Sequence, residues 1–330
     1  MIARNEFIYW PSAEVHGGSL KLSCLREDGV AHAVMPKSRL QRWRMSFQRQ
    51  EEVDLRGRFF LDLRHERFAN WSHQLNRYLL IANAIRNRLG EDLTIVVHAA
   101  MSGYVVRMYE YFGFAVVRSD GPVVGKRASF EIDKRTSIYS LRPQLVREIP
   151  ESYFGVGSSG PGADCLFLSR KDTRRVTNEA EILPMLESYG YKRVFMEEFS
   201  PAEQIAMIRN ARHIVSVHGA ALAPLQFHSG QDLNVIELLP VGHVTNFYRV
   251  MTDQAGGSYI AVRGAMKANH LQGLYEEAPF KAHTLDDFEV DPSALGLALR
   301  AQHENVPLFA EAPVLAPRKL GSAPTLVSAA

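Results

Sequence analysis

The sequence predicts an α/β protein built from two Rossmann-like units, and three observations support this class. From Cys165 onward, short apolar runs alternate with amphipathic segments, as the strands and helices of a parallel sheet do. Residues 58–118 repeat this rhythm on a smaller scale. Between the two lies 155–164, GVGSSGPGAD, a composition typical of a flexible connection. A chain of 330 residues can bury two cores of ordinary domain size.

The second unit has the clearer pattern. Ser200, Pro201 and Glu203 supply an N-cap, a first-turn proline and a capping-box glutamate, and Asn178 is a second candidate cap. Short connections between strands and helices imply parallel pairing with right-handed crossovers. The expected strands are 165–170, 193–197, 213–217 and 235–239, and the expected helices are 178–190, 200–211 and 220–227.

The first unit opens with a region rich in strands, which we expect to be antiparallel. The α/β pattern follows, with strands at 58–64, 93–98 and 114–118 and helices at 70–90 and 103–113. Beyond Ala261 only 291–302 has a helical pattern, and the Ala/Pro-rich end cannot bury much surface. The predicted divisions are 1–155, the first α/β unit; 156–262, the second; 263–305, a segment packing back on both; and 306–330, a flexible tail.

Composition excludes several classes of protein. The net charge of +2, without long runs of one sign, argues against nucleic-acid binding. Cys24 and Cys165 stand at no metal-ligand spacing, which favours a reducing, cytoplasmic compartment. The first residues lack the apolar core of a signal peptide, and no segment approaches the roughly 20 apolar residues of a membrane helix. Any membrane contact would therefore be peripheral, at the inner face.

The candidate site lies at the carboxyl ends of the strands, where open α/β sheets bind ligands. His218 and Gly219 follow strand 213–217 and begin a helix, whose free amides attract an anion. A guanidinium at Arg170 could pair with a diphosphate, and Glu237 could accept the two hydroxyls of a ribose. The predicted nucleotide-binding residues are Ser169, Arg170, His218, Gly219, Ala220, Ala221 and Glu237.

Each of these residues also has a simpler interpretation. The His-Gly pair could form a turn, Glu237 could pair with a basic side chain, and Lys171, Arg174 and Arg175 could form a solvated face. Dinucleotide-binding and P-loop glycine motifs are both missing from the sequence. No D-x-D or His/carboxylate cluster stands out either, so we expect amides and arginine, not a metal ion, to neutralise the anion.

Residues 165–240 resemble the core of glycosyltransferase family 61. The family pattern runs through Ile-Ser-Arg, a basic loop, Asn-Glu, Ser/Thr-x-x-Glu-Gln, His-Gly-Ala-Gly and a Val-Ile-Glu strand, and this chain keeps its order and spacing. NWSHQLNRYLL, 70–80, resembles the start of a helix in the family's acceptor half. The chain departs from the pattern at three places: Ala221 replaces the second glycine, Ala223 and Pro224 replace Thr-Asn, and Gln74 replaces an aromatic residue.

The resemblance implies a GT-B-like enzyme with two Rossmann-like lobes facing a central cleft. The second lobe would bind a UDP-sugar and the first a glycan or glycoconjugate acceptor, as in bacterial polysaccharide biosynthesis. Transfer would proceed with inversion, without a metal ion or other cofactor. Arg170 and the amides after His218 would then stabilise the departing UDP.

An inverting transfer also needs a general base for the acceptor hydroxyl. We expect His73 in that role, because imidazole titrates near neutral pH and this position begins a helix in the other unit. A capping or packing role for His73 remains open, and Asp62, His65 and Glu66 are rival bases. Two other functions remain open as well: a non-catalytic nucleotide-sugar-binding subunit, or another group transferase of the pyruvyl or phosphoglycosyl type on the same architecture.

Overall fold

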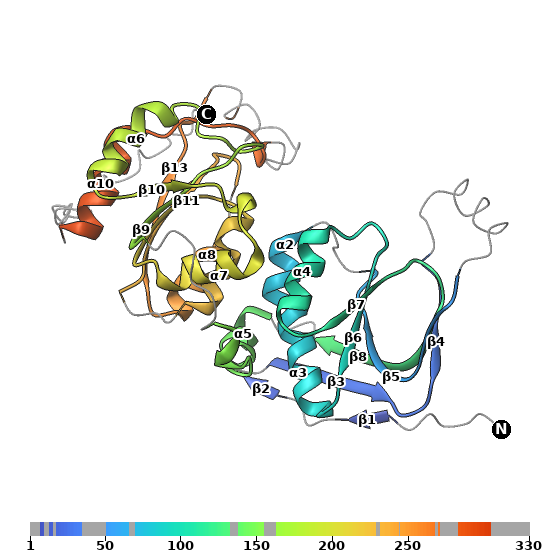
Figure 1. Ribbon diagram of the computed structural model, residues 1–330. Coiled ribbons are helices and arrows are strands. Elements are labelled where there is room, and N and C mark those ends of the chain that lie inside the picture. The colour runs from blue at the N-terminus through green and yellow to red at the C-terminus, as the bar shows by residue number, and fades with distance from the viewer. Residues whose placement is uncertain are drawn as a thin grey trace, which may run out of the picture.

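The computed structural model describes residues 7–9, 13–15, 18–34, 51–65, 70–132, 138–154, 163–228, 232–243, 245–267, 270 and 283–304. These residues form a mixed α/β fold with two separate sheets (Figure 1). Most of the expected connection, 155–162, and the whole expected tail, 306–330, lie outside the described residues.

The second half of the chain contains a five-stranded sheet in which every pairing is parallel. This confirms the four strands that the sequence predicts, and it adds β13 at the edge. The expected strand 193–197 is shorter than predicted, because residues Met196–Glu198 turn into a short 3₁₀-helix, η3. The order is β10 (Lys192–Val194), β9 (Cys165–Leu168), β11 (His213–Val217), β12 (Asn234–Leu239) and β13 (Ser258–Arg263).

The helices of this half largely follow the sequence pattern. Ser200 and Glu203 form the predicted capping box. The predicted cap by the Asn178 side chain is wrong, because its amide bonds the backbone of Val290 instead. Residues 220–227 form a 3₁₀-helix, not an α-helix, with Pro224 inside it. The helices are α6 (Glu179–Ser188), α7 (Pro201–Asn210), η4 (Ala220–Phe227), α8 (Phe247–Gln254) and α10 (Pro292–His303).

The first half contains a mixed sheet of eight strands with the order β1-β3-β8-β5-β6-β7, β2 pairing with β3 and β4 with β8. The opening strands pair antiparallel, as expected. The sequence pattern did not reveal β8, which lies between the antiparallel and parallel parts. The strands are β1 (Phe7–Tyr9), β2 (Ala13–Val15), β3 (Gly18–Leu25), β4 (Gly29–Ala31), β5 (Val53–Asp62), β6 (Leu93–Val97), β7 (Ala115–Arg118) and β8 (Val123–Ile132).

One long helical segment of the first half carries an irregular turn. It begins as α2 (Trp71–His73), widens into a π-helical turn, η1 (Gln74–Tyr78), and continues as α3 (Leu79–Leu89). Such π-turns occur often at functional sites. Two further helices, α4 (Gly103–Tyr111) and α5 (Ile138–Arg147), complete this half.

The two halves pack directly on each other. The core of the first half includes Ile205, Ala223 and Phe227, which belong to α7 and η4 of the second half. Helix α4 contacts α7, and α2 contacts η4. Figure 1 shows these helices between the two sheets. The first turn of α2 is thereby held close to the carboxyl ends of β9 and β11.

Candidate functional site

The structure brings the residues that follow β9 and β11 to one edge of the second sheet. These two strands are parallel neighbours, so Arg170 after β9 and His218 after β11 leave the sheet side by side. Both residues line a cavity of about 460 Å³, together with Arg174, His243 and His73. We call it the basic cavity. Gly219 and Ala220 line it as well.

Two guanidinium groups converge in the basic cavity. Arg170 Nη1 lies 3.5 Å and Arg174 Nη1 lies 3.2 Å from the carbonyl oxygen of His218. Their Nε atoms donate to the carbonyls of Thr173 and Thr284. Neither arginine has a carboxylate partner in the described part of the chain. Two cations held together without a counter-ion form a site for an anion.

Backbone and burial both fix Arg174 in this place. Its φ angle is +64°, which is unusual for a residue other than glycine. Burial, and next the nearby Arg170 charge, lower the pKa of the Arg174 guanidinium. Both effects disfavour the charged guanidinium, and a bound anion would offset them. The sequence offered Arg174 only as one of several loop cations, because its orientation depends on the contact with Thr284, more than 100 residues away.

Glu237 does not line the cavity, which corrects the predicted role at the ribose. Its side chain is fully buried in the middle of β12, not at the strand's end. One carboxylate oxygen bonds Nδ1 of His218, and the other accepts the hydroxyl of Tyr259 at 2.5 Å. Both oxygens are therefore occupied by protein donors. The alternative in which Glu237 pairs with a basic side chain describes it better, the partner being the imidazole of His218.

The Glu237 carboxylate fixes the orientation of His218. A carboxylate can only accept, so Nδ1 of His218 carries a proton, and Nε2 is the nitrogen left for a ligand. His243 packs against the His218 ring with 3.9 Å between ring centroids. Burial, followed by the His218 charge, lowers the pKa of His243 to about 4, so this second ring is neutral near neutral pH. His243 follows β12, and the strand-end rule could have found it.

His73 reaches the basic cavity from the other half of the chain. Asn70 caps the helix by accepting from the His73 backbone N–H at 3.2 Å, so the capping function belongs to Asn70 and not to the imidazole. Gln74, next in sequence, is fully buried and accepts from the Tyr109 hydroxyl at 2.8 Å. The departure from the family pattern at Gln74 therefore affects the core and not the cavity.

The rival bases are less well placed. Asp62 is buried in an ion pair with Arg64. Burial would raise the pKa of Asp62, but the Arg64 guanidinium outweighs it and lowers the pKa, so the carboxylate is a poor base. His65 is exposed and does not line the basic cavity. Glu66 lies outside the described residues.

A second cavity of about 410 Å³ adjoins the basic cavity and shares Trp71, Arg170 and Ala220 with it. We call it the aromatic cavity, because Trp71 and Tyr104 form part of its wall. Ser169 and Ala221 also line it, so the predicted residues divide between the two cavities. Ser169 is only 2% exposed, and its hydroxyl donates to Glu179 at 2.5 Å. This hydrogen bond connects the end of β9 to the start of α6 and so stabilises the loop between them.

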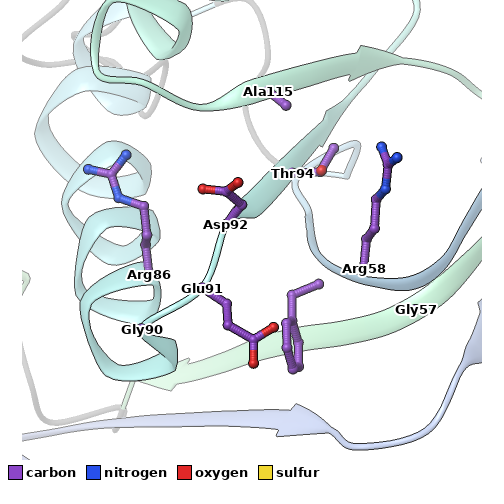
Figure 2. Close-up of a pocket in the computed structure, with 9 residues that line it drawn as sticks. Gly57, Arg58, Arg86, Gly90, Glu91, Asp92, Thr94 and Ala115 are labelled. Atoms are coloured by element: carbon purple, nitrogen blue, oxygen red, sulfur yellow. The ribbon is translucent and has the colours of Figure 1, made fainter.

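A third cavity, of about 880 Å³, lies elsewhere (Figure 2). Thr94 and Ala115 line it near the beginnings of β6 and β7, at the edge opposite the carboxyl ends. Arg86 at its border is already bound, donating to the carbonyl of Phe112 at 2.7 Å and stacking on Phe114. We therefore place the site by its chemistry and not by volume.

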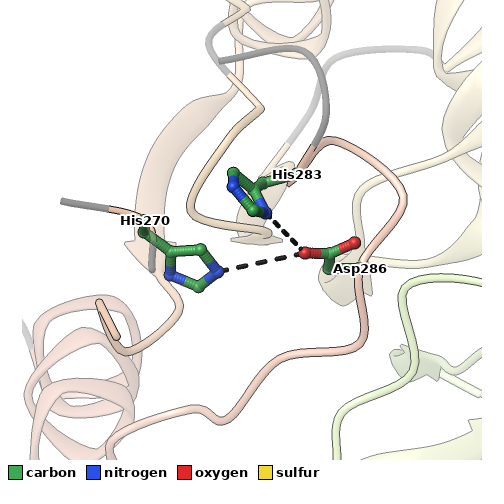
Figure 3. Close-up of side chains that lie close together, drawn as sticks. All are labelled: His270, His283 and Asp286. Carbon is green, nitrogen blue, oxygen red and sulfur yellow. Dashed lines mark hydrogen bonds and ion pairs between the residues drawn. The ribbon is translucent and has the colours of Figure 1, made fainter. Parts of the chain in front are cut away.

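Among the described residues, one group of side chains has the composition of a metal site: His270, His283 and Asp286 (Figure 3). The Asp286 carboxylate lies 2.8 Å from Nδ1 of His283 and 3.9 Å from Nε2 of His270. The backbone N–H of Lys267, however, donates to Nδ1 of His270 at 3.0 Å. The neutral ring then carries its proton on Nε2, facing Asp286, which leaves no lone pair for a metal. Two separate hydrogen bonds, between His283 and Asp286 and between Lys267 and His270, describe the group better than a metal site does.

No helix within the described ranges is both long enough and apolar enough to span a bilayer.

Comparison with known protein families gives one match. The family model described as Glycosyltransferase 61 matches residues 67–232, a stretch that includes α2, both cavity-lining strand ends and η4. No curated protein matches the chain in sequence. Among solved structures, the glycosyl transferase family 9 protein from Veillonella parvula DSM 2008 is similar over 78% of this chain and 99% of its own, at 10% identity. Its TM-score of 0.38 is too low to support an inference.

Proposed function

The chain belongs to glycosyltransferase family 61, and from this membership and the basic cavity we propose that it transfers a sugar from a nucleoside diphosphate, UDP by preference, to a hydroxyl of a glycan or glycoconjugate. The transfer inverts the anomeric carbon. The two halves act as the facing lobes of a GT-B enzyme, the second holding the donor and the first the acceptor.

The pair of arginines at the His218 carbonyl carries this proposal. Arg170 and Arg174 leave two positive charges in one cavity without a carboxylate partner among the described residues. A diphosphate would supply the missing negative charge and accept bidentate hydrogen bonds from both guanidiniums. A single carboxylate could pair with one of the two guanidiniums, whereas a diphosphate can pair with both at once.

The start of η4 adds neutral donors to the same place. The first hydrogen bond within this turn runs from the Leu222 N–H to the Gly219 carbonyl at 3.2 Å. The amides of Ala220 and Ala221 precede it, so they are the helix-start donors that an anion can use. In the transition state negative charge grows on the leaving diphosphate, and fixed donors of this kind stabilise it. The two guanidiniums and the helix-start amides together give the positive potential that other enzymes obtain from a divalent ion.

His73 is the proposed general base. It lines the basic cavity from the first half, whereas the anion-binding groups come from the second half. An inverting displacement needs the base and the anion-binding groups on opposite faces of the sugar, because the acceptor hydroxyl attacks opposite to the leaving group, and this division is compatible with that need. A hydroxyl between His73 and the anomeric carbon would lose its proton to the imidazole as the new glycosidic bond forms.

Release of UDP from UDP-sugars in the absence of acceptor tests the proposal. We expect slow hydrolysis that Arg174→Ala and Arg170→Ala each reduce by about tenfold or more, as expected for loss of one charge-assisted bond. Arg212→Ala is the matched control, because Arg212 is exposed and paired with Asp232. Activity should survive EDTA.

Three results would count against it. Equal UDP release by Arg174→Ala and the control would contradict the anion site. Tight binding without turnover on any acceptor would favour a binding subunit. Stabilisation by phosphoenolpyruvate, and not by nucleotide sugars, would favour a pyruvyl-type transferase.

A further inference from the structure

We infer that the aromatic cavity binds the nucleoside of the donor, with its base beside Trp71 and Tyr104 and its ribose hydroxyls on Asp172 and Glu197. This inference rests on the proposed function and assigns the part of the donor that the basic cavity does not hold. It also replaces the ribose-binding role that the sequence predicted for Glu237.

The wall of the aromatic cavity suits a flat ring. Trp71 and Tyr104 meet edge to face, with 4.5 Å between ring centroids and 63° between planes. Met196 and Ala221 supply further apolar surface from the second half. The indole N–H of Trp71 is buried and has no acceptor among the described residues. Because that nitrogen has almost no accessible surface, Trp71 offers a ligand its ring and not its N–H.

Two carboxylates at this cavity are available to hydroxyl groups. Asp172, in the loop after β9, and Glu197, in η3, both line the cavity. Within the described ranges neither forms an ion pair, whereas their neighbours Lys171 and Glu198 pair with each other. Vicinal hydroxyls of a ribose donate to carboxylates of this kind, which accept without competition from a protein donor.

Gln204 holds Glu197 in position. Its side chain is only 3% exposed, and its amide donates to the carbonyls of Met196 and Phe199, on either side of Glu197. The turn η3 is thereby tied to α7. In the Ser-x-x-Glu-Gln pattern of this chain, Gln204 therefore positions η3, while Glu203 caps α7.

The direction of the donor follows from the border between the cavities. Arg170 and Ala220 belong to both, so a diphosphate bound there has one cavity on each side. The transferred sugar must lie with His73, because the base has to reach the hydroxyl that attacks the anomeric carbon. The nucleoside, at the other end of the diphosphate, then extends into the aromatic cavity.

Calorimetric titration of the full chain tests this assignment. The ligands are inorganic pyrophosphate, the tightest binder among UDP, CDP, ADP and GDP, and the 2′-deoxy form of that nucleotide. We expect Glu197→Gln and Asp172→Asn each to weaken the nucleotide by about tenfold. Pyrophosphate should bind them as well as, or more tightly than, wild type, because a nearby negative charge is removed. Glu187→Gln, an exposed glutamate on α6 that lines neither cavity, is the control.

The deoxy ligand separates a ribose contact from a general charge effect. The wild type should bind the 2′-deoxy form more weakly than the parent nucleotide. In Glu197→Gln or Asp172→Asn, or in both, the two ligands should bind with nearly equal affinity. Trp71→Ala should weaken the nucleotide but not pyrophosphate. If nucleotide and pyrophosphate bind every variant with wild-type affinity, the nucleoside assignment is wrong while the proposed function stands. If neither binds the wild type, the proposed function itself fails.

Discussion

Substitution of Gly219 by alanine tests the geometry of the anion site most directly. A Cβ atom at this position would lie 1.8 Å from Nη1 and 3.1 Å from Cζ of Arg170, where ordinary contact begins at 3.4 Å. The guanidinium must therefore move by at least 1.6 Å, the difference between 3.4 and 1.8 Å. The backbone itself accepts alanine, because φ is 166° and ψ is −176°, an extended conformation. The substitution thus acts on Arg170 and leaves the fold intact.

The expected cost is the loss of one charge-assisted hydrogen bond. Such bonds contribute about 1.5–3 kcal/mol, which corresponds to a roughly tenfold to 150-fold rise in the Kd for UDP. Calorimetry gives the Kd, and thermal unfolding checks that the variant folds as the wild type does. We expect Gly219→Ala and Arg170→Ala to have similar effects.

The double variant decides whether the reasoning is right. If Gly219→Ala acts only by displacing Arg170, it should weaken UDP binding by less than about 0.5 kcal/mol in a chain that already carries Arg170→Ala. Equal losses of UDP binding free energy with and without Arg170→Ala would show that the alanine obstructs the ligand itself. Unchanged UDP affinity in the single variant would refute the role of Arg170 in the anion site.

Three further predictions concern the surroundings of the site. Glu237→Gln should lower the free energy of unfolding by about 1–3 kcal/mol in urea titrations, because His218 and Tyr259 donate to different carboxylate oxygens and the NH2 group that replaces one of them cannot accept. Unchanged stability would contradict the buried contacts. Phe227→Ala should cost about 3–5 kcal/mol, since the ring fills the core shared by both halves, and two separate unfolding transitions would refute that shared core. The pKa of the His243 imidazole is 6.5 in the unfolded chain and about 4 in the folded protein. Between these values the unfolded chain binds a proton that the folded protein does not, so the free energy of unfolding decreases as the pH falls from 6.5 toward 4. His243→Gln should flatten this part of the curve of Tm against pH, and an unchanged slope would contradict it.

Much of the second half could be predicted because its strands are buried on both faces. Phe167 and Val215 face one apolar cluster while Leu166 and Ile214 face another. Such strands have continuous apolar runs, which stand out in a sequence. Strand β8 is harder to recognise because charged residues interrupt it, as in the stretch from Lys126 to Glu131. Its place between β3 and β5 depends on pairing partners far away in the chain.

The sequence by itself determined which residues leave the second sheet at its carboxyl edge, since strand periodicity and chain order place Arg170, His218 and Gly219 there. Only the tertiary structure decided how the side chains around them are used. It turned Glu237 inward to His218 and Tyr259, and it brought Trp71 and His73 to the same edge through the packing of α2 against η4. The reason is that a side chain's accessibility depends on what covers its strand or helix, and these covering elements come from distant parts of the chain.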